Sequence, residues 1–395
     1  MRHTVLQDKS ACTGCGACVS ICPKGAIAMR ADDEGFLYPA VHSELCIECN
    51  LCEKRCPAGN TPEENEIHVL GAQHVDADVR AVSSSGGVFT ALARDMLAKG
   101  GVVFGAAFDT ALHVEHIGAF DETELAGMRG SKYVQSDASD AIANAAALLE
   151  REIPVLFSGT PCQIAGLLAK VGKHGREHLL TVDFVCHGVP SPGVFSSYIK
   201  ELEENSGKRV ISYTFRDKRN GWKDFSAVAT FEDGSEHVGS QRDEPFLYGF
   251  LQNLYLRPSC AGCSRLRGKH HASDITIADL WGAQQICAQH DDDTGLSLLI
   301  INTPRGKAAV EACTKMLKTF NTDTEQMLRF NPSIEYPAKA HGKRSRFFAD
   351  FKKQGFRAQH VMKLLAPPSR LERLLRRIAH LPKGALRRAM ALFRK

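Results

Sequence analysis

The sequence predicts three successive parts: an α+β head, an α/β body with a mixed, partly parallel sheet, and a basic helical tail. Two cysteine-rich runs lie within the first 60 residues. Further along, short apolar strand patterns alternate with amphipathic helix patterns, which is typical of α/β proteins. Basic residues gather in the last segment, residues 366–395, where nine Lys or Arg side chains accompany one acid, Glu372.

The composition is that of an ordinary globular protein, with 44% hydrophobic and 24% charged residues among 395. A chain of this length buries a core without disulfides, so its 14 cysteines need another explanation. Residues 1–11 contain no apolar stretch of a secretory signal, and no apolar run approaches the roughly 18 residues that span a bilayer. We therefore expect a cytoplasmic chain whose reduced cysteines bind metal or take part in catalysis.

The net charge is unevenly distributed along the chain. The whole chain carries +4 and residues 366–395 carry +8, so the remainder carries −4. Because the body is mildly acidic, the overall basic balance does not indicate nucleic-acid binding.

Two cysteine runs define the head. Residues 12–23 read CTGCGACVSICP and residues 46–57 read CIECNLCEKRCP. Each follows the C-x2-C-x2-C-x3-C-P pattern of bacterial two-cluster ferredoxins, in which the fourth cysteine of each run binds the other cluster. The sequence therefore predicts a ferredoxin-like head with two 4Fe–4S clusters, one bound by Cys12, Cys15, Cys18 and Cys56, the other by Cys46, Cys49, Cys52 and Cys22.

The residues around these cysteines agree with tight cluster-binding loops. Gly14 and Gly16 let the first loop curl, and a proline follows each run and turns the chain away. Apolar residues 26–29 and 36–39 flank a polar turn and predict a small hairpin beside the clusters. Zinc and disulfides are the alternatives, but zinc favours two separated C-x2-C pairs over four cysteines in one short run.

We expect four segments in the chain. The head is residues 1–66, which end in a polar linker. The first part of the body is residues 67–150, the second part is residues 151–335, and the tail is residues 336–395. Partly alternating residues 274–282 and apolar residues 295–302 predict two further strands of the body sheet.

A Ser/Gly-rich turn precedes the first predicted helix of the body, residues 86–99, which a strand at 102–108 follows. The free N–H groups and the dipole at such a helix start favour an anion. The plainer alternative, which this segment alone favours, is a capped helix without a ligand. Another turn, residues 130–133, offers a lysine and a tyrosine. Neither a Walker A loop nor a G-x-G-x-x-G turn is present.

Four cysteines of the body form a second candidate metal site. Cys162 and Cys186 each follow a predicted strand of one parallel pair, at the sheet edge where open α/β sheets bind ligands. Cys162 also begins a helix, which is expected to lower the pKa of its thiol. Cys260 and Cys263 form a later C-x2-C pair. A third 4Fe–4S cluster is one interpretation, and a structural pair with two core cysteines is the other.

Taken in order, the segments that follow the head resemble the coenzyme F420 hydrogenase/dehydrogenase beta-subunit family. The resemblance covers roughly residues 5–330 and rests on SSSGGVFTAL, GSKYVQS, FSGTPCQIAGL, DFVCHGVPS, CAGC and SDITIADLWG. Members of this family are flavoproteins that hold FAD beside a 4Fe–4S cluster. The resemblance implies a cluster on Cys162, Cys186, Cys260 and Cys263, and FAD contacts from Ser84, Ser85, Gly86, Gly87, Lys132 and Tyr133.

The expected function is an iron–sulfur flavoprotein oxidoreductase that passes electrons from an external donor, through the clusters and FAD, to a small-molecule substrate. The donor is expected to be a ferredoxin-like protein or a partner subunit. An electron-transfer subunit without its own substrate and a reductase of the deazaflavin coenzyme F420 remain alternatives, because the fold does not fix the substrate. A scaffold protein would leave the motif cysteines unexplained.

The tail combines apolar and basic residues at helical spacing, for example Leu371, Leu374, Leu375 and Ile378 among arginines. Such helices lie on anionic membranes, which predicts peripheral contact at the inner face of the membrane. A helix docked on the acidic body or on a partner is the alternative.

Overall fold

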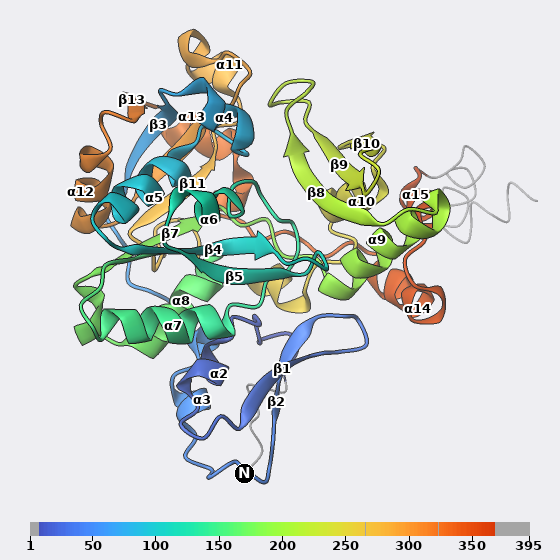
Figure 1. The fold of residues 1–395 in the computed structure, drawn as a ribbon, viewed down its shortest axis with the longest axis horizontal. Coiled ribbons are helices and arrows are strands. Elements are labelled where there is room, and N and C mark those ends of the chain that lie inside the picture. Colours follow the sequence, from blue (N-terminus) through green and yellow to red (C-terminus); the bar gives the residue numbers. More distant parts are fainter. Residues whose placement is uncertain (1–7, 265, 323, 368–395) are drawn as a thin grey trace, which may run out of the picture.

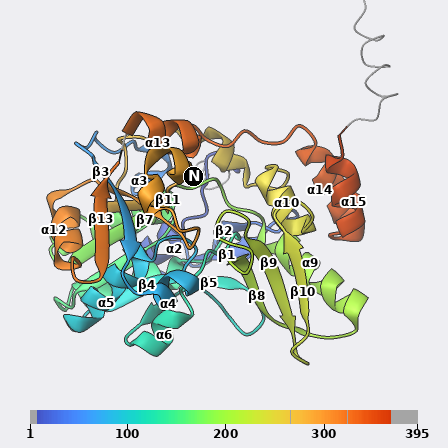
Figure 2. The ribbon, with the colours of Figure 1, turned by 90° about the horizontal axis from the view of Figure 1, so that it is seen from above.

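The computed structural model describes residues 8–264, 266–322 and 324–367. The head lies beside the large body sheet, against helices α7 and α8, and a smaller sheet forms a separate lobe of the body (Figures 1 and 2). No helix in these ranges is both long enough and apolar enough to span a bilayer. The amphipathic pattern at 371–378, on which the membrane prediction rests, lies outside the described residues.

The head contains the predicted hairpin, in which β1 and β2 pair antiparallel with Ile27 opposite Val41. The two cysteine loops on either side of this hairpin contain only short helices. Glycine and proline residues bound each loop and limit its helix to about one turn. The head elements are α2 Ala17–Ile21, β1 Ile27–Ala31, β2 Leu37–Val41, α3 Leu51–Lys54 and η1 Pro57–Gly59.

The body sheet has eight strands in the order β13-β3-β12-β11-β7-β6-β4-β5. The neighbours β4, β6, β7 and β11 run parallel, and the outer pairs are antiparallel, so the predicted mixed, partly parallel sheet is confirmed. Its strands are β3 His68–His74, β4 Val102–Phe108, β5 Val114–Ala119, β6 Val155–Ser158, β7 Leu179–Phe184, β11 Ile275–Asp279, β12 Ser297–Ile301 and β13 Leu317–Asn321.

Successive side chains of a strand point to opposite faces of the sheet, so apolar side chains lie on both faces. Helices pack on these side chains and cover both faces. Val103 and Leu156 pack with α5, α6 and α12 on one face, while Phe104 and Phe157 pack with α7 and α8 on the other. These helices, with the shorter elements around them, are α4 Ala77–Val82, α5 Val88–Ala98, α6 Glu122–Ala126, α7 Ser139–Leu149, α8 Pro161–Val171, η2 His174–Arg176, α11 Ala283–Ile286, η4 Ala288–His290, α12 Pro304–Ala312, α13 Thr324–Phe330 and η5 Pro332–Ile334.

A second, three-stranded antiparallel sheet, β10-β9-β8, was not predicted from the sequence. Its aromatic core includes Phe195, Phe215 and Phe246 and extends to Phe36 of the head hairpin. The lobe is built from α9 Pro192–Ser206, β8 Val210–Asp217, β9 Ser226–Phe231, β10 Glu236–Ser240, α10 Pro245–Leu251, η3 Pro258–Gly262, α14 Arg344–Gln354 and α15 Ala358–Leu365. The last two helices lie within the predicted tail. The four-segment division of the chain stays a prediction, and the body sheet takes strands from both predicted body segments.

The head packs on the body through a close approach of α8 to the first cysteine run. A Cβ placed on Gly166 in α8 would lie 3.1 Å from the sulfur of Cys15 and 3.2 Å from Cβ of Ala17. Only a residue without a side chain fits this contact without moving its neighbours.

We therefore expect Gly166→Leu to destabilise the protein by roughly 1–3 kcal/mol, because the larger side chain forces α8 away from the head. The free energy of unfolding in denaturant, together with the rate of proteolysis in the linker before β3, measures this effect. Gly127→Leu is the matched control, since the nearest atom to a Cβ there is 3.7 Å away. Equal losses for the two variants would contradict this packing.

Candidate functional site

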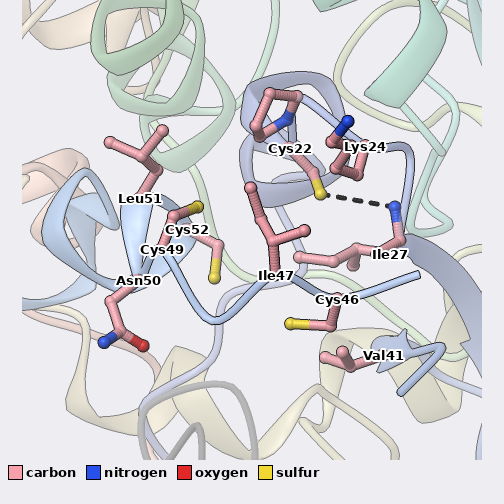
Figure 3. Close-up of a pocket in the computed structure, with 12 residues that line it drawn as sticks. Cys22, Lys24, Ile27, Val41, Cys46, Ile47, Cys49, Asn50, Leu51 and Cys52 are labelled. Carbon is pink, nitrogen blue, oxygen red and sulfur yellow. Dashed lines mark hydrogen bonds between the residues drawn. The ribbon is translucent and has the colours of Figure 1, made fainter. Parts of the chain in front are cut away.

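Four cysteines from the two runs surround one small pocket at the outer end of the head. Cys22 of the first run lines it together with Cys46, Cys49 and Cys52 of the second, and Figure 3 shows all four around the same space. Cys49 is exposed, whereas Cys52 is buried. The structure thus groups the outer set in the crossed arrangement that the spacing predicts.

The inner set of the head consists of Cys12, Cys15, Cys18 and Cys56. Burial is the largest cause that raises the pKa of the Cys15 thiol to about 11, and the neighbouring Cys56 and Cys12 contribute to this rise. Burial likewise raises the pKa of Cys18, followed by the charges of Cys15, Cys12 and Cys56 of the same set and then by that of Cys52 of the outer set. These thiols therefore lie close enough to interact electrostatically, again in the crossed grouping.

The four body cysteines also lie together. Cys162 is in the first turn of α8, Cys186 follows β7, Cys260 is in η3, and Cys263 directly follows η3. Burial raises the pKa of Cys186 to about 12, and the charges of Cys260 and Cys263 contribute. Cys162 interacts with Cys263, Cys186 and, across the boundary with the head, Cys15.

The expected lowering of the Cys162 pKa by the start of its helix is wrong for the protein without metal. Burial raises the pKa of this thiol well above its usual value and outweighs the hydrogen bond with Thr160 Oγ1, 3.1 Å from the sulfur. A buried thiolate here needs a positive partner, and a metal that replaces the thiol proton is such a partner.

The four thiols of each cysteine set are the donors that a 4Fe–4S cluster requires. Within the described part of the chain, no three or more His, Cys, Asp or Glu side chains converge on a position for one metal ion. In a 4Fe–4S cluster the four cysteines bind different iron atoms, so their sulfurs need not meet at one point.

A small pocket lies between the inner head set and the body set. Thr13 of the first run lines it, as do Cys162 and Cys263 of the body. Cys162 and Gly166 are four residues apart in α8 and therefore lie on the same face, so the contact of Gly166 with Cys15 brings the inner head set one turn along that face from Cys162.

Beyond the body cysteines lies a cavity of about 600 Å³. Residues at the carboxyl ends of β6, β7 and β11 line one side, including Cys162 and Cys186, and residues of the smaller lobe line the other. A large cavity at this edge of a parallel sheet is where α/β proteins bind ligands. Of the residues predicted to contact FAD, those that line it are Ser84, Ser85, Gly87, Lys132 and Tyr133.

The Ser/Gly turn is partly used by the protein itself. The backbone N–H of Gly86, which is not among the lining residues, donates to Ser297 Oγ at 3.0 Å. Ser84 Oγ accepts from the backbone N–H of Ser131 at 2.6 Å. Gly87 is the N-cap of α5. Because glycine has no side chain, the cap residue offers no acceptor to the N–H groups in the first turn of this helix.

Lys132 is a partly buried lysine on the cavity wall. Its Nζ donates to the carbonyl oxygens of Gly127 at 2.8 Å and Arg129 at 2.9 Å. Burial lowers its pKa to about 7. Among the described residues no carboxylate forms an ion pair with it, so an anionic ligand would stabilise its charged form.

The lobe side of the cavity is aromatic. The Tyr133 ring stacks on Phe250 with centroids 4.7 Å apart. Arg216 Nη1 donates to Tyr133 Oη at 3.1 Å and to Asp279 Oδ2 at 2.9 Å. Sequence reasoning assigned no role to Arg216 or Asp279, since their contact joins strands β8 and β11 of different sheets and leaves no spacing pattern.

A polar network centred on His116 supports the cavity floor. Its Nε2 lies 3.0 Å from the carbonyl oxygen of Ser158, which can only accept, so Nε2 carries the hydrogen. Nδ1 then accepts from Ser136 Oγ at 3.0 Å, and Ser136 Oγ accepts from Gln163 Nε2 at 2.9 Å. Burial lowers the pKa of His116 to about 4, so the neutral ring is built into the fold.

Comparison with known proteins identifies matches along most of the chain. Residues 69–143 match the family model for the coenzyme F420 hydrogenase/dehydrogenase beta subunit N-terminal part, and residues 154–325 match that for its C terminus. Residues 11–60 match the 4Fe–4S dicluster domain.

Individual relatives match parts of the chain. An uncharacterised ferredoxin of Methanocaldococcus jannaschii is 40% identical over 57 residues, which are 14% of this chain and 73% of the relative. A subunit of the F420H2 dehydrogenase of Methanosarcina mazei is 25% identical over 165 residues, and the match spans 38% of this chain and 46% of the relative. A protein chain of the F420-reducing [NiFe] hydrogenase complex from Methanosarcina barkeri is 17% identical with a TM-score of 0.46, covering 77% of this chain and 93% of that one.

The depressed pKa of His116 predicts a pH dependence of stability. Between pH 6.5 and 4 the unfolded chain binds a proton at this histidine that the folded chain does not, so stability falls as the pH falls through this window. The full effect is roughly 2–4 kcal/mol below pH 4. We expect His116→Gln to reduce the slope of unfolding free energy against pH between 6.5 and 5, and His178→Gln, at an exposed position, to leave it unchanged. Parallel slopes for all three proteins would contradict this assignment.

Proposed function

Because the chain belongs to the coenzyme F420 hydrogenase/dehydrogenase beta-subunit family and carries a 4Fe–4S dicluster domain, we propose that it is an iron–sulfur flavoprotein oxidoreductase acting between an external electron donor and a small-molecule substrate. Clusters supply transfer of single electrons, and FAD would supply the exchange between single electrons and the paired electrons of organic chemistry.

The observation that carries this proposal is the order of the three cysteine sets. The outer set reaches solvent at Cys49, the inner set lies against α8 at Cys15, and the body set opens on the large cavity at Cys162 and Cys186. This order supports a route for electrons from the surface of the head to a ligand in the cavity. We propose a third cluster on Cys162, Cys186, Cys260 and Cys263.

The cavity supports FAD through charge and shape. The start of α5 beside Ser84, Ser85, Gly86 and Gly87 favours a pyrophosphate. Lys132 is partly buried and has no carboxylate partner among the described residues, so this anion would stabilise its charged form. Tyr133 and Phe250 offer an aromatic wall for a planar ring system. In this proposal the protein holds the ligand, excludes water from it and brings it to the body thiols.

A second candidate, an electron-transfer subunit without a substrate of its own, is favoured by one finding: the F420H2 dehydrogenase relative is itself a subunit of its enzyme. The name of this relative denotes oxidation of the reduced coenzyme, F420H2, and the reverse reaction, reduction of the deazaflavin coenzyme F420, is the substrate chemistry that we keep as an alternative. Partner subunits are part of either candidate. Turnover of purified protein with reduced viologen and a substrate panel, including F420, separates an enzyme from a relay.

The first test is the cofactor content of the full chain purified without oxygen. Three clusters and one flavin predict about 12 iron atoms and 12 acid-labile sulfides with one FAD per chain. Iron and sulfide assays and flavin fluorescence after denaturation measure these quantities. About 8 iron atoms and no flavin per chain would contradict the proposal and indicate a ferredoxin domain joined to a body of another function.

The second test removes a single body ligand. We expect Cys162→Ser to lose the body cluster, lowering iron by about four atoms per chain and leaving both head clusters. Cys287→Ser is the matched control, because Cys287 is a buried cysteine that lies outside the three sets. An unchanged iron content in Cys162→Ser, or an equal loss of iron in both variants, would contradict a third cluster on the body cysteines.

A further inference from the structure

Arg257 is a buried cation that joins the smaller lobe to the inner cysteine set of the head. It is 1% exposed and lies three residues before Cys260. Its Nε donates to the carbonyl oxygen of Cys12 at 2.9 Å, and its Nη2 lies 3.7 Å from the Cys12 sulfur. Its guanidinium carbon lies 3.9 Å from the centre of the Tyr38 ring.

The surroundings of Arg257 are shaped for it. Its Nη1 donates to Gln135 Oε1 at 3.1 Å and to the carbonyl oxygen of Leu37 at 3.0 Å. Gly14, with φ of +70°, allows this approach, since a Cβ there would lie 2.8 Å from the guanidinium carbon and 2.4 Å from Gln135 Nε2. The glycine of the first cysteine run therefore makes room for a side chain of the body as well as for a tight loop.

The charge of Arg257 has no conventional partner. Within the described ranges no carboxylate forms an ion pair with it, and its hydrogen-bond partners are neutral carbonyl and amide oxygens. An unpaired buried charge is strongly unfavourable, so an anionic group is expected beside it. The contact that supplies one is Cys12, through a thiolate bound to a cluster.

Arg267 repeats this arrangement at the body set. It is buried, its Nε donates to the carbonyl oxygen of Cys263 at 2.6 Å, and its Nη2 donates to that of Cys186 at 2.9 Å. Its Nη1 donates to the carbonyl oxygen of Ser333. No described carboxylate pairs with Arg267 either. Two sets of cysteines thus each have one buried guanidinium fixed to the backbone of their ligands.

We propose that Arg257 and Arg267 are counter-charges that raise the reduction potentials of the inner head cluster and the body cluster, respectively. When a cluster accepts one electron from a one-electron reductant, its charge becomes more negative by one unit and no bond is formed or broken. A fixed positive charge nearby, in a site of low dielectric constant, stabilises the reduced form more than the oxidised form. Both arginines therefore favour reduction of the inner head cluster and of the body cluster. They touch the cysteines that bind these clusters and act as positioning residues.

The test is a redox titration of the full chain followed by electron paramagnetic resonance, with dithionite as the reductant. The inference rests on the proposed function, so iron and sulfide are first measured to establish that clusters are present. We expect Arg257→Gln to lower the midpoint potential of one cluster signal and Arg267→Gln to lower that of a different one. Arg257→Lys keeps the charge and is expected to keep most of the wild-type potential.

Arg344→Gln is the matched control. Arg344 also joins the lobe to the head, where its Nη1 donates to Glu34 Oε1 at 3.2 Å, but it is paired with that carboxylate and contacts no cysteine among the described residues. The Arg344→Gln variant perturbs the packing of the head without removing a positive charge beside a cluster. We therefore expect no shift in any midpoint potential.

The outcomes distinguish failure of the proposed function from failure of the role assigned to the two arginines. Failure of wild-type protein to incorporate iron and sulfide contradicts the proposed function itself. Clusters whose midpoints stay unchanged in Arg257→Gln and Arg267→Gln overturn the inference alone, as do equal shifts in Arg257→Gln and Arg257→Lys. If Arg257→Gln loses a cluster, its retention in Arg257→Lys supports the role of charge, and loss in both variants overturns it in favour of a purely geometric role.

Discussion

The close approach of α8 to the first cysteine run is the constraint on which the rest of the structure depends. The helix carries Cys162 in its first turn and Gly166 one turn later, against the sulfur of Cys15. One short helix therefore fixes how near the inner head set lies to the body set. A larger residue at position 166 would press against Cys15, and the proposed electron transfer between the two sets depends on a short distance.

Burial of charge is the second organising feature. Cys162 and Cys186 are thiols whose burial opposes ionisation, while Arg257 and Arg267 are buried cations without described carboxylate partners. The partly buried Lys132 has no such partner either. Taken separately, each is unfavourable in a protein interior. Anionic clusters and a phosphate-bearing ligand at these positions would satisfy both signs of charge. These buried charges are the structural reason for the clusters and the ligand that we propose.

Local patterns in the sequence were sufficient for part of this arrangement. The head cysteines, the hairpin of residues 27–41 and the β6–α8–β7 unit follow from short-range spacing and periodicity. The Thr160–Gln163 capping box at the start of α8 is another local signal, and it fixes the turn that presents Cys162. The three-stranded sheet was missed, although Asp233-Gly234 between alternating segments is a hairpin signal. Contacts such as Arg257 with Cys12 join residues 245 positions apart, so no local pattern reveals them.

Cys15 and Cys162 place two of the proposed clusters close together across the boundary between head and body. The most direct measurement is the electron paramagnetic resonance spectrum of the fully reduced full-length protein, recorded at two microwave frequencies. Neighbouring paramagnetic clusters beside Cys15 and Cys162 predict a broadened, split spectrum from spin–spin interaction. A spectrum that is the simple sum of isolated 4Fe–4S signals at both frequencies would contradict the account.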